Sequence, residues 1–158
     1  MIEIRILSSV ALLVLSLPLL GLACVEGQQH LTYEQASIAV DAAEAEAQRN
    51  GWNLTILVAD SDGVPIQLRR MEGASARSYE VAMAKVRTAL VAGMHTANYG
   101  QALAAGQTDT IPDGIPFDGG YLVRLESRVV GAMSASGARG SEDAQAVLAG
   151  LAAIGARP

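Results

Sequence analysis

The sequence contains few cysteines and few charged residues, and both shortages limit what the protein can be. Cys24 is the only cysteine among 158 residues, so no disulfide can form within the chain. Charged residues make up 17% of the chain and the formal net charge is −5, which provides no basic surface for nucleic acid. We find no internal repeat, low-complexity tract or interdomain linker. With 51% hydrophobic residues, the chain is expected to fold as one domain around its own core.

The N-terminal segment predicts export. Residues 6–22 form an apolar run that follows Arg5 and leads to the small residues Ala23 and Cys24. A basic start, an apolar middle and a small-residue exit are the three parts of a secretory signal. Pro18 and Gly21 would interrupt a membrane-spanning helix, which favours a cleaved signal over a permanent anchor. We therefore expect a periplasmic or extracellular protein.

The residues at the end of this segment are compatible with two ways of processing the signal. Cys24, directly after the apolar run, is a candidate for lipid attachment and hence for anchoring to a membrane. The alternative is simple cleavage near Ala23 or Gly27. Either way, residues 1–23 are assigned to the signal segment, residues 24–30 to a flexible mature N-terminus and residues 31–158 to the folded domain.

The folded part alternates helical and strand patterns. Thr32 and Gln35 form a capping-box pattern at the start of a helix that Gly51 ends. The turn residues Asp60 to Gly63 separate two strand-like runs and favour a hairpin over a calcium loop, which would need a closing acidic residue. The further expected elements are a helix over residues 75–92, a short helix over 99–105, strands over 121–125 and 128–136, and a helix over 142–154.

The stretch between residues 93 and 120 holds the candidate ligands. Met94 and His95 follow Gly93 at the end of the second long helix, and both side-chain types can take an axial position on haem iron. The alternative is that His95 only balances the partial negative charge of a helix C-terminus. The double glycine Gly119 and Gly120 precedes the second hairpin, and Gly137 and Gly140 form a flexible glycine loop after it, where backbone can approach a ligand closely.

Several segments carry a resemblance to a known family. Four segments are similar to the GlcG/HbpS family. They are the helix segment from Ala82 to Ala89, the sequence from Phe117 to Gly120, the strand residues from Val129 to Ala132, and Ser136 with Gly137 before the last helix. The resemblance covers residues 31–155. It implies an α/β fold, a profilin-like α/β/α sandwich with an antiparallel sheet of about five strands, and assembly into homo-oligomers.

The resemblance also implies where a ligand binds. Family members carry a pocket near the end of the second helix and the glycine-rich segments. In this sequence the matching residues are Lys85, Met94, His95, Thr96, Gly119, Gly120 and Tyr121.

Two functions remain open at this point. The first is an exported, oligomeric protein that binds haem or another tetrapyrrole, with His95 as the metal ligand and Lys85 or Arg87 pairing with a propionate. The second is a lyase, hydratase or isomerase acting on a small carboxylated substrate, with Lys85 or His95 as acid–base group and the Gly119 and Gly120 amides as oxyanion donors. The export signal favours the first. A binding module without a cofactor is a third interpretation.

Overall fold

The computed structural model describes residues 30–158. The predicted signal segment, Cys24 and the rest of the mature N-terminus before His30 lie outside the described residues. The elements in order are α1 (Tyr33–Asn50), β1 (Thr55–Asp60), β2 (Pro65–Arg70), α2 (Ala76–Ala92), α3 (Thr96–Ala104), β3 (Gly120–Leu125), β4 (Arg128–Ser136) and α4 (Gly140–Ala153). None of the helices in this described part is long and apolar enough to cross a membrane.

The strands form one antiparallel sheet in the order β2, β1, β4, β3. β1 and β2 form one hairpin, and β3 and β4 form another. The two hairpins are joined because β1 pairs with β4, in a register that runs from Thr55 opposite Ser136 to Asp60 opposite Gly131. The described sheet has four strands, where the family resemblance implied about five. Outside the four described strands, Arg157 forms a single antiparallel bridge to Arg124 at the free edge of β3.

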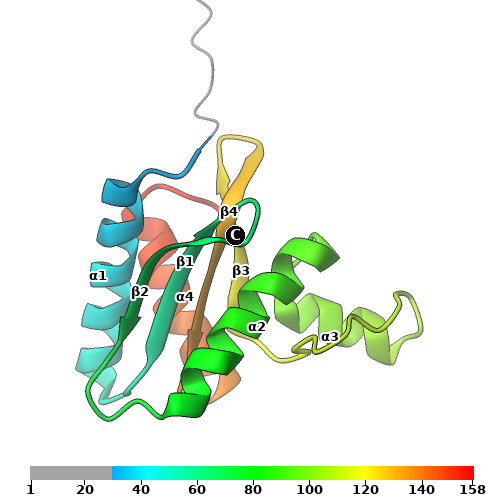
Figure 1. Cartoon of the computed structure of the whole chain (residues 1–158), viewed down its shortest axis with the longest axis horizontal. Coiled ribbons are helices and arrows are strands. Elements are labelled where there is room, and N and C mark those ends of the chain that lie inside the picture. The colour runs from blue at the N-terminus through cyan, green and yellow to red at the C-terminus, as the bar shows by residue number, and fades with distance from the viewer. Residues whose placement is uncertain (1–29) are drawn as a thin grey trace, which may run out of the picture.

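Helices cover both faces of the sheet, which confirms the predicted α/β/α sandwich (Figure 1). Strand residues alternate between the faces. Ile56 and Val58 pack into the core under α1 and α4, whereas Leu57 and Ala59 pack against Ala82 and other residues of α2. α3 and the loop after it extend away from the sheet, at the right of Figure 1.

The caps predicted for α1 are present. The Thr32 hydroxyl accepts a hydrogen bond from the Gln35 amide at 3.2 Å, and the Gln35 side chain accepts one from the Thr32 amide at 3.1 Å. The predicted turn after β1 is also confirmed, because the Asp60 carboxylate accepts hydrogen bonds from the amides of Asp62 and Val64. Local chemistry thus explains where these elements begin and end.

The small residues of α1 and α4 let these two helices pack closely under the sheet. The buried alanines of α1 are Ala36, Ala39, Ala43 and Ala47, and Ala144 and Ala146 are their counterparts on α4. A Cβ atom on Gly150 would lie 2.6 Å from the Ala39 carbonyl oxygen and 2.5 Å from Met133 Cε. The alanine-rich faces of α1 and α4 are therefore used inside the chain and are not free to pack against a second copy.

This packing predicts the effect of enlarging Gly150. We expect Gly150→Leu to destabilise the fold by about 1–3 kcal/mol, because the added side chain has no space between α1 and Met133. Urea denaturation followed by circular dichroism measures the change. The control is Ala152→Leu on the exposed face of the same helix, expected to stay within about 0.5 kcal/mol of the unchanged protein. Equal stability of both variants would contradict the packing described here.

Candidate functional site

His95 lies at the junction of α2 and α3. α2 ends at Ala92, Gly93 caps it, and His95 is the N-cap residue of α3. α3 begins at Thr96, three residues earlier than the sequence indicated. A protonated histidine is unfavourable at a helix N-terminus, so the interpretation of His95 as a charge at the end of α2 does not fit this position.

The His95 ring is held against the sheet by an aromatic contact. Its centroid lies 4.5 Å from that of Tyr121 on β3, with the ring planes inclined by 32°. His95 Nδ1 is buried and has no hydrogen-bond partner among the described residues. A buried polar atom without a partner is uncommon in a folded protein and calls for a specific explanation, such as a ligand.

The charges around His95 favour its neutral form. Burial and the neighbouring Arg124 cation lower the pKa of His95, and the Asp118 carboxylate only partly opposes them. A neutral imidazole keeps one nitrogen lone pair, which is the form that binds metals. Burial and a hydrogen bond to Asp118 raise the pKa of Tyr121 well above its usual range, so its phenol stays protonated. Asp118 and Arg124 were not among the predicted site residues, although Asp118 belongs to the quoted Phe117 to Gly120 motif.

Lys85 forms a buried ion pair with Asp143. Its Nζ donates to the Asp143 Oδ2 atom at 2.7 Å and to the Ala135 carbonyl oxygen at 2.9 Å. The second carboxylate oxygen of Asp143 accepts a hydrogen bond from the Ala138 amide at 3.1 Å. Burial lowers the pKa of Lys85 and raises that of Asp143, and each partner opposes the shift of the other. Lys85 is 2% exposed, so this ammonium faces no ligand from solvent.

Gly119 and Gly120 are packed against this ion pair. A Cβ on Gly119 would lie 2.6 Å from Lys85 Nζ, and Gly119 has a φ of +106°, which disfavours any other residue. A Cβ on Gly120 would lie 2.7 Å from the Thr96 methyl carbon. Their amides are both engaged: Gly119 donates to the Asp118 carboxylate at 2.8 Å and Gly120 donates to the Thr96 hydroxyl at 3.1 Å. The glycines therefore serve close packing, and neither amide is left to act as an oxyanion donor.

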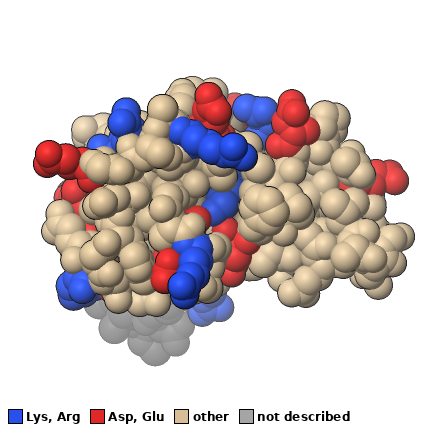
Figure 2. All heavy atoms as spheres, turned by 90° about the horizontal axis from the view of Figure 1, so that it is seen from below, with Lys and Arg blue, Asp and Glu red and all other residues tan. Residues whose placement is uncertain are grey.

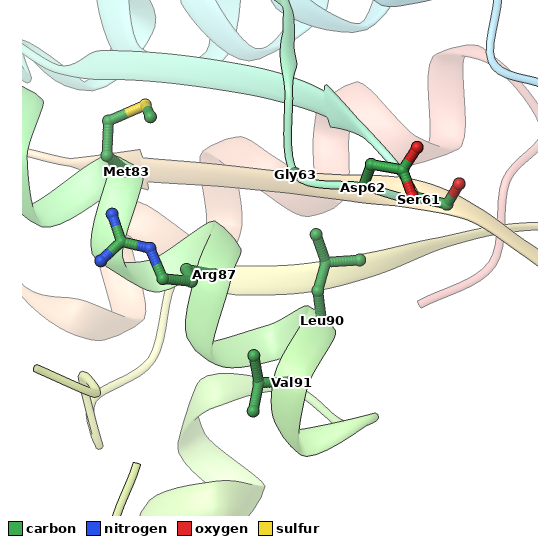
Figure 3. Close-up of a pocket in the computed structure, with 7 residues that line it drawn as sticks. All are labelled: Ser61, Asp62, Gly63, Met83, Arg87, Leu90 and Val91. Atoms are coloured by element: carbon green, nitrogen blue, oxygen red, sulfur yellow. The ribbon is translucent and has the colours of Figure 1, made fainter. Parts of the chain in front are cut away.

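The remaining predicted site residues fall into two places. Thr96 is buried and ties the start of α3 to β3, and Met94 is half-buried beside His95 in the chain. Arg87 is exposed and lines a hollow between α2 and the β1–β2 turn (Figure 3). His95 is not among the residues that line that hollow. The structure thus brings His95, Tyr121 and Thr96 together and separates Arg87 from them.

The profile of a family described as "Haem degrading protein HbpS-like" matches residues 31–152, most of the chain. The chain belongs to the HbpS-like family. This confirms the resemblance to the GlcG/HbpS family seen in the sequence.

Individual relatives agree with the family assignment. Protein GlcG of Escherichia coli is 32% identical over 108 residues, which cover 67% of this chain and 81% of GlcG. The crystal structure of HbpS is 32% identical with a TM-score of 0.73, covering 79% of this chain and 90% of that one. The PduOC:haem complex, at 22% identity and a TM-score of 0.69, covers 81% of this chain and 97% of that one and shares the fold.

In this HbpS-like chain the buried ion pair predicts a large effect of a single substitution. We expect Lys85→Met to cost about 3–5 kcal/mol of unfolding free energy, because the Asp143 carboxylate would stay buried without its cation. The double variant Lys85→Met with Asp143→Leu should recover most of that loss. Urea denaturation provides the measurement.

The matched control is Arg87→Met, which removes the same charge from an exposed site on the same helix. It should change the unfolding free energy by no more than about 0.5 kcal/mol. If the double variant is as unstable as the sum of Lys85→Met and Asp143→Leu, the two charges are not coupled and the assignment is wrong.

Proposed function

We propose that the chain binds haem or a related tetrapyrrole, with His95 as the protein ligand to the metal. The observation that carries the proposal is the His95 imidazole, which is favoured in its neutral form and has a buried nitrogen without a partner among residues 30–158. Support comes from the family, which is described as haem degrading, and from PduOC, whose crystal structure is that of a haem complex. Haem, when bound, would supply a redox-active iron.

The residues around His95 fit such a ligand. Tyr121 offers an aromatic wall, and its protonated phenol stays bonded to Asp118. Arg124 lies close enough to His95 to lower its pKa, and is the better placed cation for a propionate. Lys85 is held in its ion pair and Arg87 lines a hollow that does not include His95, so neither of the two cations first considered is as well placed for this role.

The alternative enzyme, a lyase, hydratase or isomerase acting on a carboxylated substrate, loses its expected oxyanion donors and one of its two candidate acid–base groups. Such an enzyme was expected to use Lys85 or His95 as an acid–base group and the Gly119 and Gly120 amides as oxyanion donors. The Lys85 ammonium donates to Asp143 and Ala135, and the amides of Gly119 and Gly120 donate to Asp118 and Thr96. Haem binding is therefore the function that we put forward.

Spectroscopic titration tests the haem proposal. The protein is expected to give a Soret band on addition of haem, and His95→Ala should shift or abolish the low-spin band because the axial nitrogen is lost. The control is His30→Ala, which removes the other histidine and should leave the spectrum unchanged. Identical spectra and affinities for the unchanged protein and His95→Ala would refute His95 as the ligand.

We also propose that the protein is exported, on the evidence of Arg5, the apolar run over residues 6–22 and the small residues that follow. Deleting residues 1–23 should leave a soluble, folded protein, as measured by circular dichroism and gel filtration. In cells, the full chain should be processed and recovered outside the cytoplasm, with Cys24→Ala separating lipid anchoring from simple cleavage. A truncated chain that aggregates while the full chain stays soluble in the cytoplasm would contradict export.

Self-association is the third part of the proposal. The support is the projecting lobe formed by α3 and the loop that follows, which carries few charged side chains (Figure 2). Asp109 and Asp113 are the only charged residues between Thr96 and Phe117, and Phe117 is 60% exposed. Light scattering at roughly tens of micromolar should show an oligomer, and Phe117→Ser should weaken it. A monomer at that concentration would argue against assembly.

A further inference from the structure

A hollow of about 430 Å³ lies between the β1–β2 turn and the outer face of α2. Its size falls within the range of small-molecule sites. One wall is apolar and consists of Met83, Leu90 and Val91 of α2 (Figure 3). Val91 is 65% exposed, so this apolar wall is open to solvent. The hollow shares no residue with the surroundings of His95.

The opposite wall is a turn that is already rigid. The Asp60 carboxylate accepts hydrogen bonds from the amides of Asp62 at 3.0 Å and Val64 at 2.8 Å, and the Gly63 amide donates to the Asp60 carbonyl oxygen. The side chain of Asp60 therefore holds the turn, and the side chain of Asp62 is not needed for that purpose. A preformed wall lowers the entropy that a ligand must lose on binding.

Two residues of opposite charge line the hollow, one on each wall. Arg87 comes from α2 and Asp62 from the turn, and Figure 3 shows Leu90 between them. Neither the Arg87 guanidinium nor the Asp62 carboxylate has a hydrogen bond or ion pair with another described residue. Arginine binds a carboxylate through two parallel hydrogen bonds, whereas an aspartate accepts hydrogen bonds from an ammonium or a hydroxyl group.

We propose that this hollow binds a small amphiphilic molecule with a carboxylate at one end and a hydrogen-bond donor at the other. The carboxylate pairs with Arg87, the apolar body lies along Met83, Leu90 and Val91, and the donor meets Asp62 and Ser61. A second carboxylate is disfavoured because it would face Asp62. This selectivity distinguishes the site from a merely apolar surface.

Methyl NMR of the purified protein tests the proposal with ε-aminocaproate as probe. The methyl signals of Met83, Leu90 and Val91 should shift and saturate, with tighter binding than for caproate or hexylamine and the weakest binding for adipate. Arg87→Gln should weaken binding of ε-aminocaproate about tenfold, which corresponds to the loss of a charge-assisted hydrogen bond. Asp62→Asn should weaken the binding of ε-aminocaproate and strengthen the binding of adipate, since it removes the negative charge that disfavours a second carboxylate.

The matched control is Arg77→Gln, an exposed arginine on the same helix that does not line the hollow. It should leave all affinities unchanged. The proposal is overturned if no methyl signal responds to ε-aminocaproate at roughly ten millimolar, above the affinity range that is useful for a ligand site. It is equally overturned if Arg87→Gln and Arg77→Gln behave alike, or if these methyl signals change with protein concentration alone, which would mean that a second copy covers the hollow.

Discussion

The ion pair between Lys85 and Asp143 joins the two layers of helices around the sheet. Lys85 belongs to α2 on one face and Asp143 to α4 on the other, and their side chains meet where β4 ends and β3 begins. Both groups are almost fully buried, so the loss of hydration must be offset by the ion pair and by the hydrogen bonds to Ala135 and Ala138. Any substitution that removes one of the two charges leaves the other buried without a partner, which lowers the free energy of unfolding.

The candidate site depends on this ion pair through the glycines that pack on it. Gly119 has no space for a side chain beside Lys85 and Asp143, and Gly120 lies against Thr96 in the same way. The Thr96 hydroxyl accepts a hydrogen bond from the Gly120 amide and so attaches α3 to β3. This attachment places the preceding residue, His95, against the ring of Tyr121. His95 is therefore positioned by packed backbone on rigid elements, a condition for precise ligand binding.

α2 separates two surfaces with different chemistry. Its buried side reaches the Asp143 ion pair, and its C-terminal end leads to His95, whose neutral ring suits a metal. Its outer side carries Arg87, Leu90 and Val91 above the β1–β2 turn, where a cation and an anion with no partner in the described part of the chain flank an apolar wall. One helix therefore supports a proposed haem site at its end and a proposed site for a small carboxylate along its side.

The sequence by itself determined the elements and most of their limits, because caps, turns and alternation act between residues close in the chain. Thr32 with Gln35 and the Asp60 turn are examples, and the family could be recognised from short motifs. Only the tertiary structure decided the roles of Lys85 and Arg87. Lys85 pairs with Asp143, 58 residues further along the chain. Arg87 follows two positions later in α2, but it lies on the exposed side of the helix and lines the hollow. Contacts between distant segments depend on how the layers pack, and no local pattern encodes which cation is buried and which stays free for a ligand.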